Sequence, residues 1–392
     1  MSGVKIDFQN TETAFADKSD SELKERYRLF KLMSSPKLVA IGTRLTNFAL
    51  SIGLPIGGLI KGTVFEVFCG GENIKECDRT IRKLSDSKIG TILDYSVEGK
   101  SEEEDFERTK DEILATIRRA KNDPAIPFSV FKVTGIAPLG TLEKVSAGIE
   151  LPEKSRLKWE RIQDRVAEIC GLAASIGQPI FIDAEETWIQ NAIDRLAADM
   201  MALHNRERVL IFTTIQFYRA DALELLKEQH QKAVENGYLY GIKLVRGAYM
   251  EKERERATEL GYASPIQPDK ESTDRCYDAG ISYCLDNIET LAFIAATHNE
   301  ESTRRLTAEL ERRNISKDHP NIYFSQLLGM SDNLSYVLSD HGYNVSKYVP
   351  YGPVRDSVPY LIRRAQENTA VMGQVSRELD LIKQELKRRG IS

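Results

Sequence analysis

Eight short apolar segments, separated by longer amphipathic ones, recur between Thr91 and Gly352 of this chain. Apolar runs that alternate with helical patterns are typical of β-α units around a parallel sheet. Eight such units close a barrel, and about 260 residues is near the roughly 250 typical of one. We therefore predict an α/β fold, a (β/α)8 barrel, with strands at Thr91–Tyr95, Phe128–Val133, Ile180–Asp183, Val209–Thr214, Gly241–Val245, Leu291–Ala295, Ile322–Ser325 and Val345–Val349.

An open, doubly wound parallel sheet is the alternative arrangement of β-α units. Such sheets normally have fewer strands and carry a glycine-rich phosphate fingerprint after the first strand. Here the first predicted strand ends in Tyr95-Ser-Val-Glu-Gly99, which lacks the G-x-G-x-x-G spacing. The strand count and this loop both favour the barrel.

The segments outside the barrel read as helices. Ser19 and Glu22 have the spacing of a capping box, and an apolar stripe follows until Pro36 ends it. Ile74–Leu84 is a further amphipathic helix. We expect three parts: a helical arm over residues 1–88, the catalytic barrel over 89–370 and a C-terminal helix over 371–392. The stripe consists of Leu23, Tyr27, Phe30 and Met33.

Two helices are predicted after the last strand. The first covers Pro359–Asn368, with Pro in its first turn and Asp356 or Ser357 as its cap. The second carries apolar residues at steps of three and four, which form a short heptad seam. This seam packs either on the chain's own barrel or on a partner. Its members are Met372, Val375, Leu379, Ile382 and Leu386.

The most apolar window runs from Leu45 to Ile60 and contains Pro55. It is shorter than the roughly 18 residues that a membrane span requires. We interpret it as a buried helical hairpin or turn, with a membrane-dipping element as the alternative.

Composition limits the partners. Lys and Arg number 54 against 59 acidic residues, so the chain as a whole lacks the positive field that holds nucleic acid or an anionic membrane. The five cysteines form no C-x-x-C pair, which suggests buried thiols in a reducing compartment. The N-terminal residues resemble neither a signal nor a transit peptide, so we expect a cytoplasmic protein.

Polar residues gather at the carboxyl ends of the predicted strands, where a barrel of this kind builds its active site. A charged residue inside an apolar strand is costly unless it is paired or functional. A set this rich therefore favours a functional site. It comprises Asp94, Lys132, Asp183, Glu185, Glu186, Gln216, Lys243, Arg246, Tyr249, Thr297, His298, Asn299, Gln326 and Tyr348.

Some of these residues have a structural alternative. Lys132 is also placed to form an ion pair with Asp183 at the barrel mouth. Asp94, Asp183, Glu185 and His298 include metal-ligating residue types, but they lack the spacing of a known metal motif. We therefore expect no metal site.

Arg363 and Arg364 form the densest cationic feature, directly after the last strand. Two neighbouring guanidinium groups clamp a carboxylate well, and Glu367 lies four residues after Arg363, where it can orient one of them. The alternative is a solvent-facing pair on an ordinary last helix. We favour the clamp because this helix follows the final strand.

Several strings resemble proline dehydrogenase, the FAD-dependent family that opens proline catabolism. They are ordered along the barrel and match at strand ends, so the resemblance covers the whole barrel and extends to Ala14-Phe15 in the arm. The strings are Phe128-Ser-Val-Phe-Lys132, Ile182-Asp-Ala-Glu-Glu186, Lys243-Leu-Val-Arg-Gly-Ala-Tyr249, Ala296-Thr-His-Asn299, Gln326-Leu-Leu-Gly-Met330, Lys347-Tyr-Val-Pro-Tyr-Gly-Pro353 and Tyr360-Leu-Ile-Arg-Arg-Ala-Gln-Glu-Asn368.

The resemblance implies oxidation of L-proline to Δ1-pyrroline-5-carboxylate by hydride transfer to FAD, with electrons passed to membrane quinone. It implies a substrate site made of Lys132, Asp183, Tyr249, Leu327, Tyr348, Arg363 and Arg364. It implies cofactor contacts from Gln216, Lys243, Arg246, Gly247, Ala248, Lys270, Thr273, Thr297, His298, Asn299 and Glu367. Lys270 and Thr273 match the family less well, and they are also placed to cap a helix. No residue is implied as a strong base.

Two positions depart from the family pattern: Lys243 stands where some relatives carry Arg, and Met250 where some carry Trp. The length is similar to that of the stand-alone enzyme, so a pyrroline-5-carboxylate dehydrogenase is expected only as a separate partner. The candidates for peripheral membrane contact are Lys387-Arg388-Arg389 and the Leu45–Ile60 window. The rival functions are a hydroxyproline dehydrogenase, a Schiff-base lyase using Lys132 or Lys243, and a non-enzymatic binding barrel.

Overall fold

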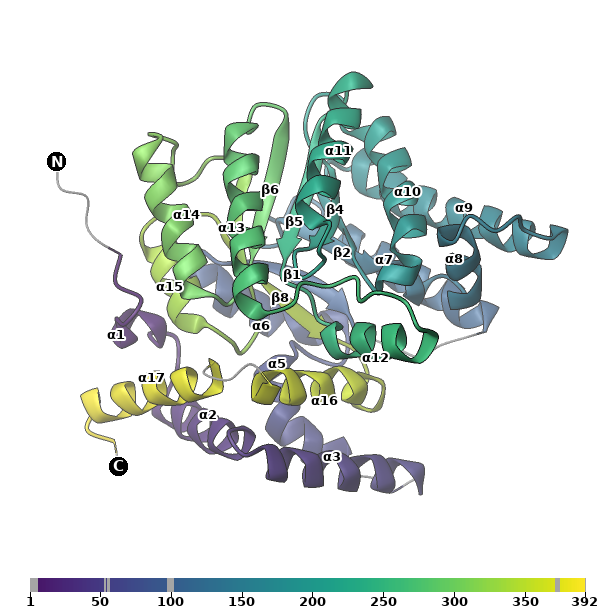
Figure 1. Cartoon of the computed structure of the whole chain (residues 1–392). Helices are drawn as coiled ribbons and strands as arrows, with labels where there is room; N and C mark the ends of the chain where they lie inside the picture. The colour runs from purple at the N-terminus through teal and green to yellow at the C-terminus, as the bar shows by residue number, and fades with distance from the viewer. Residues whose placement is uncertain (1–5, 53, 55–56, 97–101, 371–373, 392) are drawn as a thin grey trace. The chain divides into compact units, whose positions relative to one another are not determined.

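The computed structural model of the chain describes residues 6–52, 54, 57–96, 102–370 and 374–391 (Figure 1). Eight parallel strands follow one another around a closed barrel in sequence order. The predicted (β/α)8 barrel is therefore confirmed. The chain divides into two compact units: unit 1 consists of residues 1–98 and 326–392, and unit 2 consists of residues 99–325.

The strands lie close to their predicted positions: the third strand matches its predicted bounds, four strands differ by one residue at one end, and the fourth, seventh and eighth differ by two residues. The predicted start of the fourth strand at Val209 is wrong, because the Asn205 side chain accepts hydrogen bonds from the N–H groups of Leu210 and Ile211 and holds this segment as a loop. The last strand continues beyond Val349 to Tyr351. The strands are β1 Gly90–Tyr95, β2 Phe128–Lys132, β3 Ile180–Asp183, β4 Ile211–Gln216, β5 Tyr240–Val245, β6 Leu291–Ala296, β7 Ile322–Leu327 and β8 Val345–Tyr351.

Unit 2 contains β2 to β6, most of β7 and the helices between them. In Figure 1, α10, α11 and α13 lie along the outside of these strands. The helices are α7 Glu103–Ala120, α8 Leu139–Ser146, α9 Glu153–Ser175, α10 Thr187–His204, α11 Ala222–Glu235, α12 Met250–Leu260, α13 Lys270–Asp286 and α14 Glu300–Arg312.

Aromatic rings fill the inner face of the unit 2 strands. Phe128 stacks on Phe181 with ring centroids 4.7 Å apart. Phe212 and Tyr323 meet the Phe128 ring edge-on, at 5.7 and 4.8 Å. Because strand side chains alternate between faces, Lys132 shares the face of Phe128, and Asp183 that of Phe181. An aromatic layer therefore lies beneath the charged residues at the strand ends.

Unit 1 contains β1, β8, the end of β7, the helical arm and the C-terminal helices. β1 and β8 pair in parallel from Gly90 opposite Ser346 to Tyr95 opposite Tyr351. A π-helical turn, Lys61–Phe65, joins two of the helices. The helices are α1 Thr11–Ala14, α2 Asp20–Met33, α3 Pro36–Ser51, α4 Gly57–Ile60, α5 Glu66–Phe68, α6 Ile74–Asp86, α15 Asp332–Asp340, α16 Val354–Ala370 and α17 Gln374–Arg388.

The start of the arm folds as predicted. The Ser19 side chain accepts a hydrogen bond from the Glu22 N–H at 3.2 Å, and the Glu22 carboxylate accepts one from the Ser19 N–H at 2.7 Å. This reciprocal capping box begins α2. Leu23, Phe30 and Met33 of the predicted stripe are buried. These side chains form the arm's part of a hydrophobic core in unit 1.

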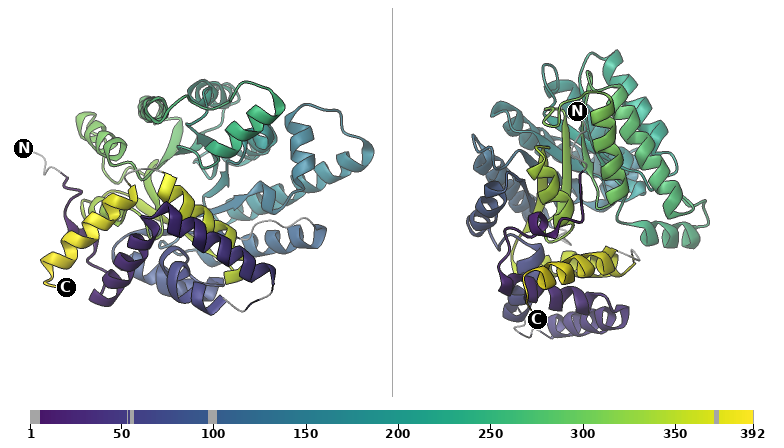
Figure 2. Two further views of the ribbon diagram at one scale, coloured as in Figure 1. Left: turned by 60° about the horizontal axis from the view of Figure 1, so that its bottom comes forward. Right: turned by 90° about the vertical axis from the view of Figure 1, so that its left-hand side faces the viewer.

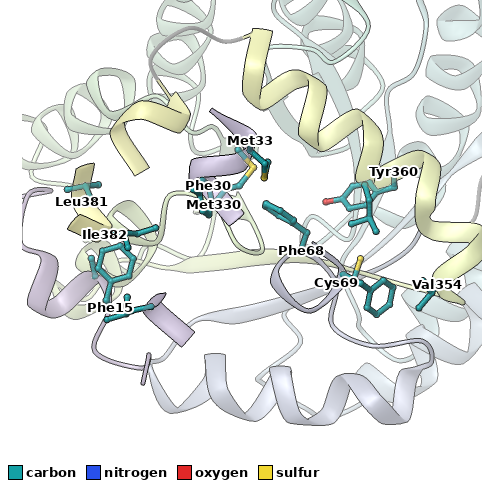
Figure 3. Close-up of a cluster of buried hydrophobic side chains, with 14 residues drawn as sticks. Phe15, Phe30, Met33, Phe68, Cys69, Met330, Val354, Tyr360, Leu381 and Ile382 are labelled. Carbon is teal, nitrogen blue, oxygen red and sulfur yellow. The ribbon is translucent and has the colours of Figure 1, made fainter. Parts of the chain in front are cut away.

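That core joins sequence segments far apart in unit 1 (Figure 3). It draws on the arm, on the turn after β7 and on both C-terminal helices. Because these helices share one apolar cluster, the arm and the C-terminus depend on each other for burial. The labelled members are Phe15, Phe30, Met33, Phe68, Cys69, Met330, Val354, Tyr360, Leu381 and Ile382.

The prediction for the helix after β8 is wrong at its start. α16 begins at Val354, so Asp356 and Ser357 lie inside its first turns rather than capping it, and Pro359 lies within the helix. The helix therefore begins before Pro359, the residue at which the sequence predicted its first turn. Proline is common in a first turn, and that preference placed the predicted start too late.

The last helix packs on the arm rather than on the barrel strands. α17 lies alongside α2 in both views of Figure 2 and also contacts α1. Ile382 of the predicted seam is buried in the shared core, and Leu379 and Leu386 pack against it. Met372 lies outside the described residues, and the side chain of Val375 lies outside the described side chains.

The predicted burial of the Leu45–Ile60 window is wrong at three of its apolar side chains, whereas Ile60 packs partly buried against the unit 1 core. Leu45, Ile52 and Leu54 are exposed by 62, 55 and 50%. The apolar composition of this window therefore did not predict whether its side chains are buried. None of the helices that the structure describes combines the length and apolarity of a membrane span.

Candidate active site

Asp183 lies between two lysines at the carboxyl ends of three unit 2 strands. The Lys243 ammonium donates a hydrogen bond to one of its carboxylate oxygens, and the Lys132 Nζ lies 3.6 Å from the other. The predicted pairing of Lys132 with Asp183 is confirmed, and Lys243 joins the same carboxylate. Lys243 also lies 5.3 Å from the centre of the Phe181 ring. One carboxylate thus orients two cations above the aromatic layer.

Glu185 links the loops that follow β2 and β3. Its carboxylate accepts hydrogen bonds from the Thr134 hydroxyl and, at 3.0 Å, from the Thr134 N–H. Burial raises the pKa of Glu185 to about 7, and the neighbouring Glu186 charge adds to the rise. A carboxyl group with this pKa changes charge near neutral pH.

The backbone of Glu185 fixes a second side chain of the predicted site. Its carbonyl oxygen accepts a hydrogen bond from the Gln216 amide at 2.6 Å, and its N–H donates to Gln190 at 2.9 Å. Gln216 is buried at the end of β4. The orientation of this predicted flavin contact is therefore set by the loop after β3.

Arg246 is held rigidly after β5. Its guanidinium donates to Asp274 at 2.7 Å, to the Thr297 hydroxyl at 2.5 Å and to the Ser302 hydroxyl at 2.8 Å. The Lys270 ammonium donates to the other Asp274 oxygen at 2.5 Å. Burial on its own would raise the pKa of Asp274, but the hydrogen bonds from Lys270 and Arg246 outweigh it and lower that pKa. The structure thus brings three predicted cofactor residues to one carboxylate network.

The backbone beside Arg246 has a conformation that favours glycine. Gly247 has a φ of 123°, and a Cβ added there would lie 2.5 Å from the Tyr218 ring. Gly247 and the following Ala248 are exposed. Their main chain is therefore accessible to a ligand while being fixed from behind.

Two other predicted cofactor residues act at helix starts. The Asn299 side chain accepts a hydrogen bond from the Ser302 N–H at 3.0 Å and caps α14. Thr273 donates to the Asp269 carbonyl at 3.2 Å, inside the first turn of α13. Asp269 caps that helix, so Lys270 and Thr273 begin it without capping it. His298 is half-buried, between Thr297 and Asn299.

The donors in unit 2 fit the flavin cofactor that the sequence suggests. A dinucleotide carries an anionic pyrophosphate and a ring edge with hydrogen-bonding groups. Arg246 and Lys270 supply cations, Gly247 supplies accessible backbone and Gln216 supplies an amide. Their chemistry matches both ends of such a molecule.

Apart from Tyr249, which lies directly before α12 in unit 2, the predicted substrate and cofactor residues not yet placed belong to unit 1. The Leu328 N–H donates to the Tyr348 carbonyl at 2.8 Å, which ties the segment after Leu327 to β8. Arg363 and Arg364 are half-buried on α16, and the Arg364 guanidinium lies 5.6 Å from the Tyr360 ring. A fully solvent-facing pair is therefore excluded. The side chain of Glu367 lies outside the described side chains.

Three residues of the site escaped the sequence interpretation. Thr134, Asp274 and Ser302 each hold a predicted residue in place through the hydrogen bonds above. No spacing or motif marks them, because their roles depend on loops that meet only in the fold. Within the described residues, no group of three or more His, Cys, Asp or Glu side chains is arranged to hold a metal ion.

Comparison with known proteins identifies related sequences. The chain is 35% identical over 348 residues to the carbapenem antibiotics biosynthesis protein CarD of Pectobacterium carotovorum subsp. carotovorum, covering 88% of this chain and 90% of that protein. It is 32% identical over 433 residues to the mitochondrial proline dehydrogenase 1 of Dictyostelium discoideum, covering 98% and 75% of the two chains.

Among solved structures, proline utilization A (PutA) from Bdellovibrio bacteriovorus, inactivated by N-propargylglycine, matches with a TM-score of 0.73 at 20% identity. The match covers 96% of this chain and 40% of that chain, and at this identity it shows the fold alone. A family model described as proline dehydrogenase matches residues 77–377. Because that match spans more than half of its length, the chain belongs to the proline dehydrogenase family.

Proposed function

We propose that this chain oxidises L-proline to Δ1-pyrroline-5-carboxylate, the first step of proline catabolism to glutamate, with FAD as hydride acceptor and quinone as the final electron acceptor. The observation that carries the proposal is the Lys132–Asp183–Lys243 cluster at the strand ends of a chain from this family. The cluster supplies oriented cations above an apolar floor, as an amino-acid substrate with a carboxylate and an apolar ring requires.

The substrate carboxylate is assigned to Lys132, Arg363 and Arg364. Charge-assisted hydrogen bonds from these cations bind a carboxylate strongly, and guanidinium groups bind it bidentately. Asp183 holds the Lys132 ammonium in place through an ion pair. The proline ring is assigned to Tyr249, Leu327 and Tyr348, whose apolar surfaces suit a saturated ring.

FAD, when bound, supplies the acceptor for the hydride that leaves the ring carbon beside the proline nitrogen. The residues that would hold it are Gln216, Lys243, Arg246, Gly247, Ala248, Thr297, His298, Asn299 and Glu367, together with Lys270 and Thr273, which match the family less well. The rigid hydrogen-bond network of Arg246 supports this assignment, because a preorganised cation binds an anion without reordering.

The chain's contribution to the reaction is then binding and orientation. Binding of the carboxylate and the ring at fixed positions orients one carbon–hydrogen bond of the substrate. Such positioning lowers the activation free energy by several kcal/mol. No residue has to act as a strong base if proline binds with its amine deprotonated. Turnover should therefore rise with pH toward the pKa of the bound substrate amine, and a profile that is flat between about pH 6 and about pH 9 would contradict this.

The visible spectrum of the purified protein tests the proposed function. We expect a flavin band near about 450 nm that anaerobic L-proline bleaches. A colourless protein that borohydride traps covalently with a carbonyl substrate would instead support a Schiff-base lyase. Hydroxyproline is the rival substrate, and a higher kcat/KM for hydroxyproline than for proline would reassign the enzyme within its family.

Quinone is a membrane-soluble acceptor, so we also propose peripheral membrane contact through α3. Leu38, Ile41 and Leu45 lie on one stripe of this helix and are exposed by 50, 55 and 62%. Lys37 and Arg44 are exposed beside the stripe. The sequence contains no acidic residue between Glu25 and Glu66, in contrast to the rest of the chain. An apolar stripe with cations at its flank suits an anionic lipid surface.

The other membrane candidate is weaker. Arg388 and Arg389 both donate to Glu385, and Arg389 also pairs with Asp20 at 3.1 Å. Their charge is largely used within unit 1. Flotation with anionic vesicles should therefore fail when Leu38, Ile41 and Leu45 are changed to Ser, and should persist in the control Lys387→Glu. Loss of flotation in Lys387→Glu alone would instead assign the membrane contact to the C-terminal residues.

The same function implies a place for the protein. A quinone-linked enzyme of this kind would lie on the cytoplasmic face of a membrane, and its product would pass to a separate pyrroline-5-carboxylate dehydrogenase. Fractionation of cells into soluble and membrane fractions, before and after a high-salt wash, tests the peripheral contact.

A further inference from the structure

Lys347 is a charged residue fully enclosed on the last strand of the barrel. It precedes Tyr348 on β8, so the two side chains point to opposite faces of the strand. The Lys347 side chain is only 1% exposed, and its Nζ lies 2.7 Å from the Asp332 carboxylate. Burial of a charge is costly, so such a residue needs full compensation.

The Lys347 ammonium uses all three of its donors on one short segment. Besides Asp332, it donates to the Met330 carbonyl at 2.8 Å and to the Leu327 carbonyl at 3.3 Å. These three partners bracket residues 327–332, which connect β7 to α15. Lys347 therefore holds the end of β7 against β8.

The segment has little freedom to adjust. Gly329 has a φ of 78°, and a Cβ added there would lie 2.4 Å from the Val67 carbonyl oxygen. Ser331 has a φ of 50°, which is uncommon for a residue other than glycine. Its N–H donates to the Glu378 carboxylate at 2.5 Å. Because residues 327–332 are fixed at this many points, a displacement of Lys347 should also displace this segment.

The helical arm reaches the same carboxylate. Arg26 of α2 donates to Asp332 at 3.0 Å, and the Lys18 Nζ lies 3.6 Å from it. Asp332, Lys347 and Lys18 are buried. Buried ion clusters often add little net stability compared with apolar packing, so a requirement for fixed geometry explains this cluster better than stability does.

We propose that the Lys347–Asp332 pair is a positioning device for the wall that receives the substrate ring, and that Arg26 of the arm reinforces it. Lys347 binds the carbonyl of Leu327, and the Leu328 N–H binds the carbonyl of Tyr348. Both ring-wall residues are thus fixed through their own main chain. This inference rests on the proposed function, since it takes Leu327 and Tyr348 as ring contacts.

The device is specific to the ring and not to the carboxylate. The cations assigned to the carboxylate are Lys132, Arg363 and Arg364. Lys347 bonds instead to Asp332, Met330 and Leu327. Loss of the device should therefore weaken ligands that carry a five-membered ring more than ligands that carry a carboxylate alone. A merely structural role would weaken both classes equally.

Calorimetry with two probe ligands tests this in the purified holoenzyme. The first probe is tetrahydrofuran-2-carboxylate, a ring carboxylate without an oxidisable amine, and the second is acetate. We expect Lys347→Met to lower the ring preference, the ratio of the acetate Kd to the ring-carboxylate Kd, by about tenfold, because misplacement of a wall by an ångström is costly. Asp332→Asn should shift the ratio in the same direction by a smaller factor.

Lys110→Met is the matched control. Lys110 pairs with Glu107 at 3.0 Å and Glu168 at 3.1 Å between α7 and α9 of unit 2, so its loss removes a lysine that also bridges two carboxylates but is less buried than Lys347. The control should keep the ring preference of the wild type. An unchanged ratio in Lys347→Met, or an equal change in Lys110→Met, overturns the inference. If Lys347→Met does not fold, an unchanged ratio in Asp332→Asn overturns it.

The failure of the proposed function gives a different result. If the wild-type protein binds the ring carboxylate no better than acetate, the assignment of Leu327 and Tyr348 to a substrate ring is itself wrong. If the wild type prefers the ring and the variants keep that preference, only the positioning role is wrong.

Discussion

Glu185 accepts hydrogen bonds from both the main chain and the hydroxyl of Thr134, and so joins the end of β3 to the turn after β2. The pair holds a buried carboxyl group whose pKa is raised to about 7, chiefly by burial. Between the unperturbed pKa of 4.5 and the raised pKa of about 7, the folded protein keeps a proton that the unfolded chain has lost. The pair therefore makes stability depend on pH in a defined direction.

Glu185→Gln should remove that dependence. The pKa of Glu185 rises from 4.5 in its unperturbed form to about 7 in the fold, so its contribution to stability is full below about pH 4.5 and is lost as the pH rises through 7. Between about pH 5 and about pH 8, the wild type should lose on the order of 3 kcal/mol more unfolding free energy than Glu185→Gln. Urea unfolding at the two pH values measures the difference.

Glu309→Gln is the control for this prediction. Hydrogen bonds from Arg312 and Arg313 lower the pKa of Glu309 to about 2, so its titration falls outside that pH range. Its substitution should leave the pH dependence of the wild type intact. Parallel curves for Glu185→Gln and the wild type would show that Glu185 titrates at its ordinary pKa.

A second buried carboxyl group should control the docking of the C-terminal helix. Burial raises the pKa of Glu378 to about 7, and the nearby Asp332 charge adds to the rise, while the Ser331 N–H opposes it. Its stabilising contribution is therefore lost as the pH rises from 4.5 through 7. We expect α17 to become more sensitive to limited proteolysis toward pH 8 in the wild type and to stay protected in Glu378→Gln.

The barrel was predictable because its determinants are local. Alternation of apolar runs placed β3 within its observed bounds, and the capping spacing of Ser19 and Glu22 located the start of α2. The charged residues Asp94, Lys132, Asp183 and Lys243 were visible for the same reason, since a lysine or aspartate inside an apolar run is conspicuous. Lys132 and Asp183 were paired correctly on this basis.

The remainder depends on contacts between distant segments. The sequence indicated only Lys132 as a partner of Asp183, and the fold shows that Lys243 binds the same carboxylate. The raised pKa of Glu185 arises from burial that no spacing encodes. Leu45 is apolar whether it lies in a core or on a surface, so its burial was predicted wrongly. Lys347 was part of a recognised string, yet its pairing with Asp332 needs the turn after β7.

Asp183→Asn should be strongly destabilising. The substitution leaves the Lys132 and Lys243 ammonium groups together without the carboxylate that both contact. Removal of one partner from a buried ion pair costs about 3–5 kcal/mol. We expect a matching loss of unfolding free energy and a loss of proline turnover. Asp286→Asn removes the exposed partner of Arg313 and should cost no more than about 1 kcal/mol.

Gly247→Ala should perturb the backbone that we assign to the cofactor. The φ of 123° is strained for any residue with a side chain, and the added methyl group would meet the Tyr218 ring at 2.5 Å. Tyr218 is buried and fixed on its other side, so the loop rather than the ring has to move. We expect both a lower Tm and a lower flavin content in the purified protein.

Gly261→Ala is the control for backbone strain in the absence of a steric clash. Gly261 also has a positive φ, 71°, but nothing lies within 4 Å of a Cβ added there. Its substitution should cost about 1 kcal/mol through backbone strain alone and should leave the flavin content unchanged. The excess loss in Gly247→Ala then measures the clash with Tyr218 together with the greater backbone strain of a φ of 123°. Equal losses in the two variants, with full flavin content in both, would remove Gly247 from the cofactor site.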